Sequence, residues 1–235
     1  MTVIGTVRGL WRYPVKSMLG EQLTEAEIDE RGVVGDRLYA VRTDDDKLGS
    51  GKNSRRFRRI DGLFDLRARY RGPDARPEIA LPDGRDVQDA DSELRRFLGR
   101  DDIRLAAEND LMHFDAAPLH LATTASISAM ADAVQTVAVD ERRFRPNIVI
   151  DTGNARGFVE NDWVDHTATI GNSVRISFSK VTERCVMTNN AQYELARSPD
   201  VLKTATRLNN MCVGIYATVL ATGPIRLGDD VILDS

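Results

Sequence analysis

One of the two cysteines, Cys185, lies in a setting that could do chemistry. In the stretch VTERCVMTNN (181–190) it follows the charged pair Glu183 and Arg184, and a polar segment comes after it. A neighbouring cation favours the thiolate, the form of cysteine that acts as a nucleophile or binds a metal. A free cysteine is more often a small buried residue, which is what we expect of Cys212 among its apolar neighbours. Cys185 is therefore the candidate reactive residue.

Two short basic clusters could serve the same chemistry. They are GKNSRRFRRI at 51–60 and DERRFRPN at 140–147. Basic clusters are most often solvated faces of a protein. In the alternative, two or three of these arginines converge on a compact anion, because a planar guanidinium can bind oxygen atoms in pairs.

The motifs of the commonest enzyme classes are missing. The sequence has no GxGxxG after a strand, no GxxxxGK[ST], no GxSxG and no CxxC. His113, His120 and His166 lack the spacing of a helical zinc site, and we expect His120 to be a hydrogen-bonded, half-buried residue. A Cys–His nucleophilic pair stays open, since its members need not be close in sequence.

Composition predicts a soluble globular protein. Of 235 residues, 42% are hydrophobic and 29% charged, and the net charge of −4 argues against general nucleic-acid binding. No apolar run approaches the ~20 residues needed to span a bilayer. The start of the chain does not have the pattern of a signal peptide. We expect a cytoplasmic protein with two free thiols and no membrane span.

The pattern of apolar residues predicts a mainly β chain, α+β by content, with three short helices. A strand should open the chain and break at Pro14. Two hairpins are expected, one at 168–181 with Val174, Ile176 and Phe178 inward, and one at 214–234. The helices are expected at 91–100 with Ser92 as cap, at 123–134 behind a threonine cap, and at 198–208 with Ser198 as cap. Leu202, Ala205 and Leu208 should form the apolar stripe of the last helix, and Trp163 should anchor the core.

The polar stretch around residues 99–110 is the best candidate for a domain boundary. It divides a smaller N-terminal β unit (1–98) from a C-terminal barrel-like unit (99–235).

Seven stretches together resemble one protein family, in the family's order and over nearly the whole chain. They are YPVKSMLGE (13–21), RGVVGDRLYAV (31–41), PLHLATTAS (118–126), RFRPNIVID (143–151), NDWVDHTATIG (161–171), ERCVMTNN (183–190) and GPIRLGDDV (223–231). The chain resembles MOSC-domain proteins with an N-terminal MOSC β-barrel unit, the family of the molybdenum cofactor sulfurase C-terminal part and of the amidoxime-reducing component. FRPN followed by RC is the most specific part.

The resemblance implies a β-barrel that binds the molybdenum cofactor, with Cys185 as the thiolate ligand of the metal. A soft thiolate suits molybdenum in a sulfur environment, and the phosphate and pterin of the cofactor need cations. Pyridoxal phosphate is not expected. The positions that match cofactor-holding residues are Lys16, Ser17, Arg37, Thr124, Arg145, Asn147 and Arg184. From the residues alone, Arg145 could instead pair with Asp140 or Glu141.

Three functions follow as alternatives. The first is a molybdenum-dependent reductase of N-hydroxylated or N-oxygenated small molecules, fed by a separate electron-donor protein because two cysteines cannot hold an iron–sulfur cluster. The second is a molybdenum-independent sulfurtransferase or C–S bond-cleaving enzyme with Cys185 as nucleophile or persulfide. The third is a cofactor carrier without turnover.

Two departures from the family pattern lie beside the expected substrate face. Many relatives have a second cysteine three positions before the reactive one, where this chain has Thr182. The acidic turn that usually follows the RC motif is replaced by TNNAQYE (188–194). These changes leave cofactor binding in place as an expectation and leave the reaction open.

Overall fold

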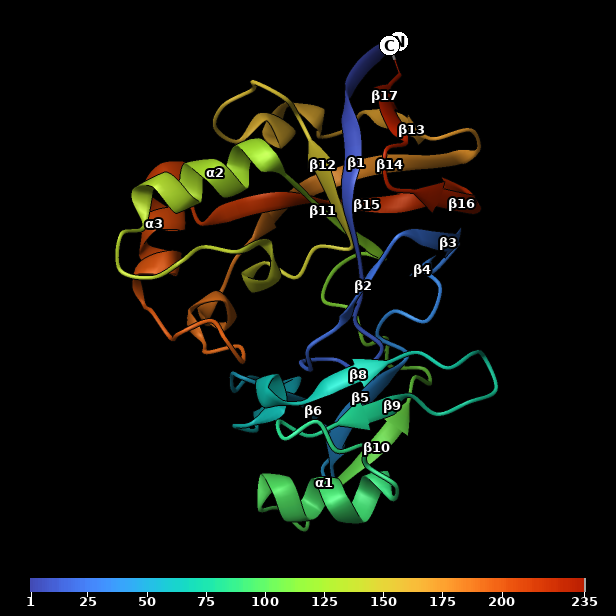
Figure 1. Cartoon of the computed structure of the whole chain (residues 1–235), viewed down its shortest axis with the longest axis vertical. Coiled ribbons are helices and arrows are strands. Elements are labelled where there is room, and N and C mark those ends of the chain that lie inside the picture. Colours follow the sequence, from blue (N-terminus) through green and yellow to red (C-terminus); the bar gives the residue numbers. More distant parts are fainter. Residues whose placement is uncertain (235) are drawn as a thin grey trace.

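The larger part of the molecule is a closed β-barrel. The computed structural model describes residues 1–234. Within them, seven strands follow one another around the barrel in the order β12-β11-β15-β14-β13-β17-β1, and β1 closes the ring by pairing with β12 (Figure 1). The strands are β1 (Thr2–Arg12), β11 (Leu119–Thr123), β12 (Ile148–Asp151), β13 (Thr167–Ile170), β14 (Val174–Glu183), β15 (Cys212–Ala221) and β17 (Asp230–Leu233). The short β2 (Glu21–Leu23) pairs antiparallel with the end of β1.

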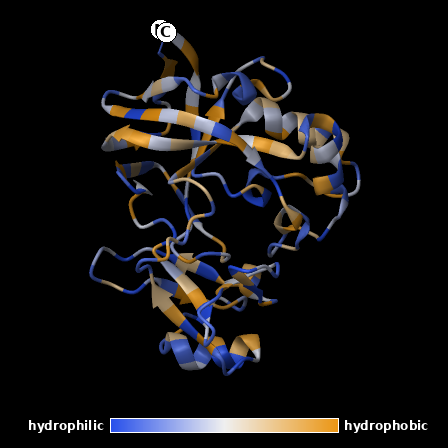
Figure 2. Ribbon diagram, turned by 180° about the vertical axis from the view of Figure 1, so that it is seen from behind, coloured by the Kyte–Doolittle hydropathy of each residue, from blue (hydrophilic) through white to orange (hydrophobic). Residues whose placement is uncertain are grey.

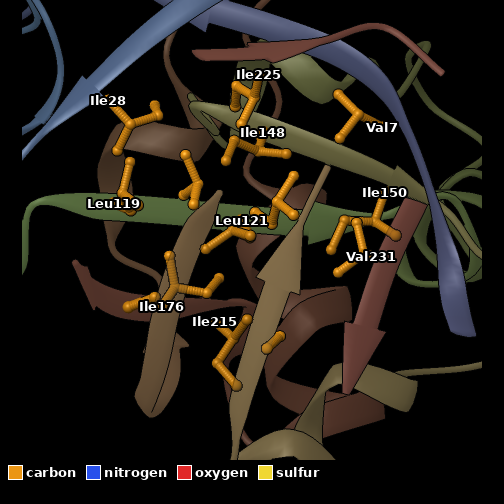
Figure 3. Packing of buried hydrophobic residues seen from close by; sticks show 14 of the residues in the cluster. Val7, Ile28, Leu119, Leu121, Ile148, Ile150, Ile176, Ile215, Ile225 and Val231 are labelled. Atoms are coloured by element: carbon orange, nitrogen blue, oxygen red, sulfur yellow. The ribbon is translucent and has the colours of Figure 1, made fainter. Parts of the chain in front are cut away.

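Alternating side chains fill the barrel. Val174, Ile176 and Phe178 of β14 are at most 1% exposed, which confirms the inward face predicted for this hairpin. Leu121 of β11 and Ile215 of β15 belong to the same hydrophobic cluster, and Figure 3 shows them beside Ile176. Figure 2 shows apolar and polar residues alternating along the barrel strands. Burial of this apolar surface is the main force that closes the barrel, and closure leaves few free strand edges.

Trp163 is part of this core, as predicted. It ends the 3-10 helix η3 (Val159–Trp163), is 6% exposed, and its ring lies 5.5 Å from that of Phe178. A large buried aromatic side chain fixes the loop against the barrel wall.

The smaller unit is built on a four-stranded sheet with the order β10-β5-β6-β7 (Figure 1). Its own core contains Val41, Leu66, Leu94 and Ile103. The elements are β5 (Tyr39–Thr43), β6 (Leu48–Ser50), β7 (Phe57–Arg59), η1 (Leu63–Asp65), β8 (Arg67–Arg69), β9 (Glu78–Ala80), α1 (Ala90–Leu98) and β10 (Ile103–Ala107). A third sheet, β16-β3-β4, consists of β3 (Glu25–Asp29), β4 (Gly32–Val33) and β16 (Gly223–Arg226).

The two units interleave in sequence. Strand β1 comes first in the chain but belongs to the barrel, whereas β10 follows residue 98 and pairs with β5 of the smaller sheet. The division into 1–98 and 99–235 stays a prediction.

Three α-helices occur within residues 1–234, as expected: α1, α2 (Thr124–Ala133) and α3 (Asp200–Asn209). Thr123 caps α2 through a capping box with Ser126. None of these helices combines the length and the apolar character that crossing a bilayer requires.

Two of the three local predictions about the helix ends and faces are wrong. Asp89 precedes α1, and Ser92 lies inside it with its hydroxyl donating to Asp89. The predicted cap of α3 is confirmed, because the Ser198 hydroxyl accepts from the Asp200 N–H at 3.2 Å and Pro199 between them has a helical backbone conformation. Val201 is buried in α3 while Leu208 is 38% exposed, so the apolar stripe is rotated from the predicted one.

The predicted C-terminal hairpin at 214–234 is also wrong. Strand β15 already pairs with β11 on one edge and with β14 on the other. Because a strand has only two edges, β16 pairs with β3, and β17 pairs with β1 and β13.

Candidate functional site

A cavity of about 330 Å³ lies between the barrel and the smaller unit. Seven of the eight residues predicted to form the site line this cavity: Lys16, Ser17, Arg37, Arg145, Asn147, Arg184 and Cys185. They come from segments that are far apart in the chain. Loops after β1, β4 and β14 and the turn before β12 bring them together.

The cavity is strongly cationic. Seven lysine or arginine side chains line it, against the carboxylates of Asp115 and Glu183. The whole chain has a net charge of −4, so this concentration of positive charge is local. Because like charges in a partly buried site repel one another at low dielectric, the arrangement fits an anionic ligand.

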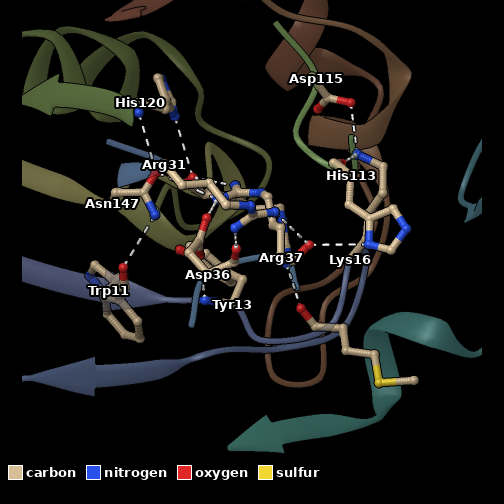
Figure 4. A network of polar contacts seen from close by, with 12 residues as sticks. Trp11, Tyr13, Lys16, Arg31, Asp36, Arg37, His113, Asp115, His120 and Asn147 are labelled. Atoms are coloured by element: carbon tan, nitrogen blue, oxygen red, sulfur yellow. Dashed lines mark hydrogen bonds and ion pairs between the residues drawn. The ribbon is translucent and has the colours of Figure 1, made fainter. Parts of the chain in front are cut away.

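Lys16 lies at the floor of the cavity and is 5% exposed. Its ammonium donates to the His113 carbonyl at 2.7 Å and to Asp115 Oδ1 at 2.9 Å (Figure 4). It also lies over the ring of Phe57. Burial lowers the pKa of Lys16. Lys16 is therefore a cation that its contacts with His113 and Asp115 hold in a fixed position at the cavity.

Arg37 and Asn147 join the two units. The Arg37 guanidinium is paired with Asp36, donates to the Arg145 carbonyl at 3.3 Å and reaches Asn147 Oδ1 at 3.4 Å. Asn147 is 1% exposed; its Oδ1 also accepts from the His120 N–H and its Nδ2 donates to the Trp11 carbonyl (Figure 4). The amide of Asn147 thus holds β1, β11 and Arg37 in place.

Arg145 and Arg184 have donors without partners. Arg145 Nη1 donates to the Met18 carbonyl at 2.7 Å, while its buried Nη2 has no hydrogen-bond partner. Arg184 Nη2 donates to the Phe144 carbonyl at 2.8 Å, while its buried Nε has none. Burial lowers the pKa of Arg145 to about 10 and also lowers the pKa of Arg184. Buried polar atoms in proteins are rarely left unpaired, so these donors fit a ligand rich in acceptors.

The alternative pairing of Arg145 with Asp140 or Glu141 is wrong. Asp140 pairs with Arg142 at 2.8 Å, and Glu141 pairs with Arg8 at 3.0 Å. The Arg145 guanidinium lies instead over the ring of Tyr13, 4.1 Å from its centre.

Three cavity residues have left-handed backbone conformations. The φ angles of Ser17, Arg37 and Arg145 are 64°, 52° and 54°. Such a conformation costs a residue other than glycine about 1–2 kcal/mol. Strained backbone of this kind is concentrated at functional sites.

Cys185 follows β14 and precedes the 3-10 helix η4 (Val186–Asn189). Its thiol is partly exposed, and Lys52 Nζ lies 3.5 Å from its Sγ. His120 also lines the cavity, but its Nε2 faces Arg184 and its Nδ1 faces the Arg145 carbonyl. It is 4% exposed, hence buried where we expected it half-buried, and burial holds its pKa well below the ordinary value. The described hydrogen bonds contain no Cys185–His pair.

Three other residues of the sequence analysis lie elsewhere. Thr124 begins α2 at the far end of β11 and donates to Asp151 Oδ1 at 3.3 Å, so the structure does not bring it to the cavity. Thr182 is fully buried and its hydroxyl has no partner. Cys212 is partly exposed, which corrects the expected burial.

The basic cluster at 51–60 divides between its two interpretations. Lys52 and Arg56 line the cavity, whereas Arg58 pairs with Asp45 and Arg59 with Asp61. The sequence indicated that some basic residues of 51–60 could converge on an anion, but it did not show which ones. It carried no signal for Tyr216, which lines the cavity because β15 places it opposite His120.

The protein offers a metal at most a few ligands here. Within residues 1–234, no three His, Cys, Asp or Glu side chains gather into a group that could hold a metal ion.

Closed barrel, smaller β unit and the cavity between them define a MOSC-type architecture. Residues 108–232 match the model of the MOSC domain, and residues 4–70 match the MOSC N-terminal beta barrel domain. The chain belongs to the MOSC-domain family.

Two individual proteins are similar to it. The mitochondrial amidoxime reducing component 2 of Homo sapiens is 25% identical over 285 residues, covering 97% of this chain and 83% of that protein. The crystal structure of the YUAD protein from Bacillus subtilis is 11% identical, with a TM-score of 0.56, and covers 97% of this chain and 94% of that one. The second likeness shows a shared fold.

Proposed function

We propose that the cavity binds the molybdenum cofactor and that the protein is a reductase of N-hydroxylated or N-oxygenated small molecules. One observation carries the proposal: the partly exposed thiol of Cys185 shares a cavity with the guanidinium of Arg145 and with Arg184, whose buried Nε has no partner. The similarity to an amidoxime reducing component supports the reaction class.

The cavity residues fit the parts of this cofactor. Lys16, Arg37, Arg145 and Arg184 would hold its phosphate and pterin, and Ser17 lines the same cavity. Cys185 would bind the metal, with Lys52 balancing the charge of the thiolate. When bound, the molybdenum cofactor would supply the chemistry for a two-electron removal of oxygen, and the residues of the cavity would bind and orient the cofactor and the substrate. The electrons come from a separate donor protein.

The test compares the two cysteines. Cys185→Ala and Cys212→Ala would be expressed with the wild type in a host that makes the cofactor, with molybdenum measured by mass spectrometry and pterin by fluorescence after oxidation. We expect near-stoichiometric molybdenum in the wild type and in Cys212→Ala, and loss of the metal in Cys185→Ala. Neither metal nor pterin in the wild type, beside a loaded control protein, would overturn the proposal.

Sulfur transfer is the second candidate, and the contact between Lys52 and Cys185 favours it. A cation 3.5 Å from a partly exposed sulfur suits nucleophilic thiolate chemistry without a metal. Incubation with thiosulfate, which transfers its outer sulfur to the thiolate and releases sulfite, followed by intact-mass measurement, would show one added sulfur atom in the wild type and none in Cys185→Ala. A loaded protein that reduces no N-hydroxylated substrate with a chemical electron donor would instead support a carrier.

A further inference from the structure

A second, smaller pocket lies on the far side of Arg145 from Cys185. It has a volume of about 50 Å³ and is lined by residues that include Trp11, Tyr13, Gln192 and Leu195. Arg145 is the only residue that lines both this pocket and the large cavity among the parts of the chain described here. Cys185 and the other predicted cofactor residues do not line it.

Three buried polar atoms without partners belong to residues of this pocket. They are the phenol oxygen of Tyr13, the amide nitrogen of Gln192 and Nη2 of Arg145. Tyr13 is 2% exposed and Gln192 3% exposed. All three groups can donate a hydrogen bond. Buried donors are normally paired, so the pocket fits a group that carries several acceptors.

The donors are held in place by the surrounding backbone. Gln192 and Leu195 exchange backbone hydrogen bonds at 3.0 and 2.9 Å around Tyr193, which has a φ of 48°. The Tyr13 N–H donates to Asp36 at 2.7 Å, and the Tyr13 ring lies under the guanidinium of Arg145. Donors fixed before binding lose little conformational freedom when a ligand arrives.

The charge of the pocket indicates an anion. Arg67 and Arg142 line it together with Arg145, and none of the described lining residues carries a carboxylate. Arg142 is neutralised by Asp140, but Arg67 makes no ion pair within residues 1–234. The remaining walls, including Trp11, Leu19 and Leu195, are aromatic or aliphatic.

We propose that this pocket binds the carboxylate of a small organic acid, independently of any metal at Cys185. The guanidinium of Arg145 offers the planar fork that matches a carboxylate, and Tyr13 and Gln192 complete its hydrogen bonds. A water molecule needs about 10–15 Å³, so the pocket has room for roughly four heavy atoms, which suits a carboxylate with a short carbon chain. Leu19, Arg67 and Tyr193 also line an adjoining surface groove that can take the rest of the acid.

Trp11 provides the readout. The chain has two tryptophans, of which Trp11 lines the pocket and Trp163 is buried in the barrel core. Acetate and propionate would be titrated into the protein against chloride at constant ionic strength, with fluorescence emission recorded. We expect a saturable change that is absent in Trp11→Phe and is kept in Trp163→Phe.

Matched variants locate the site. Gln192→Leu and Tyr13→Phe should weaken binding about tenfold, as expected for a lost hydrogen bond to a charged group, whereas Gln88→Leu at an exposed position should leave it unchanged. Thermal unfolding of each variant would show that it is folded. An equal titration in wild type and Gln192→Leu, or no saturable change at all, would overturn the proposal.

Three further outcomes would also overturn it. A response lost in Lys16→Met but kept in Gln192→Leu would place the anion in the large cavity. Equal or tighter binding of phosphate would indicate a tetrahedral anion instead of a carboxylate. Loss of the response in cofactor-loaded protein would assign the pocket to the cofactor, and this result leaves the proposed function intact.

Discussion

Single residues at this site act largely by holding one another. Asn147 was predicted to bind the cofactor, yet its amide contacts the Trp11 carbonyl, the His120 N–H and Arg37. It is better described as a residue that positions Arg37. Arg145 and Arg184, in contrast, each keep one buried donor without a partner. The family pattern marks both kinds of residue alike, and only the contacts separate them.

Replacement of Asn147 by leucine should destabilise the fold. It leaves the Trp11 carbonyl and the His120 N–H buried without their side-chain partner, so we expect a loss of about 2 kcal/mol in the free energy of unfolding. Urea denaturation measures the change. Asn154→Leu at an exposed position should stay within about 0.5 kcal/mol of the wild type. Equal stability of both variants would contradict the assigned role.

His113 should make stability depend on pH. Burial lowers its pKa to about 4 from an ordinary value of 6.5. Between these values the unfolded chain binds more protons than the folded one, so stability falls as the pH is lowered from 6.5 to 4. The free energy of unfolding that this group removes on acidification from neutral pH is at most about 3 kcal/mol.

The pH effect of His113 is separated from that of other groups by two variants. Urea denaturation at pH 7 and at pH 4.5 should show a smaller loss of stability on acidification in His113→Gln than in the wild type. His166→Gln, at an exposed position, should behave like the wild type. The same acid loss in all three proteins would refute the assignment.

Among the elements, β15 shapes the barrel side of the cavity through Gly214. Its φ is +87°, and a Cβ there would lie 2.4 Å from His120 Nε2 and 2.5 Å from the Leu121 carbonyl. The missing side chain lets β15 approach β11 where His120 and Tyr216 face the cavity. Gly214→Ala should therefore lower the free energy of unfolding through both backbone strain and overlap.

Gly153 offers a matched comparison for this prediction. It also has a positive φ, of +59°, but a Cβ there would meet nothing within 4 Å. The stability of Gly153→Ala therefore measures the effect of backbone strain alone. We expect the free energy of unfolding of Gly214→Ala, measured by chemical denaturation, to be lower than that of Gly153→Ala by about 2 kcal/mol. If the two variants were equally stable, steric contact with His120 would be excluded as the reason for the glycine.

Local patterns in the sequence predicted elements whose causes are local. The alternation of Val174, Ile176 and Phe178 and the threonine before α2 were sufficient, because one face and one cap determine them. The C-terminal hairpin failed because strand partners depend on which edges other strands already occupy. Adjacent strands in sequence favour pairing, and barrel closure overrode that preference here.

On the scale of the whole molecule, the site is assembled from segments that local patterns cannot join. Lys16, Arg37, Arg145 and Cys185 meet only because the barrel and the smaller unit face each other across the cavity. The order of the family motifs predicted this gathering for seven residues. Thr124 lies outside the cavity and Tyr216 was not predicted to line it, because neither the position of α2 relative to the cavity nor the register of β15 could be read from the motifs.

A cavity with this excess of cations should make the whole protein respond to polyanions. An anion that fills the cavity reduces the repulsion between its cations, and it does so only in the folded state. Millimolar pyrophosphate should therefore raise the unfolding temperature of the cofactor-free protein. The expected rise is about 2–4 °C for each kcal/mol of binding energy. Scanning calorimetry at constant ionic strength measures the shift against sodium chloride. Lys16→Met should reduce it, and Lys203→Met on the exposed face of α3 should not. A rise of the same size with chloride would mean that screening, and not occupation of the cavity, stabilises the fold.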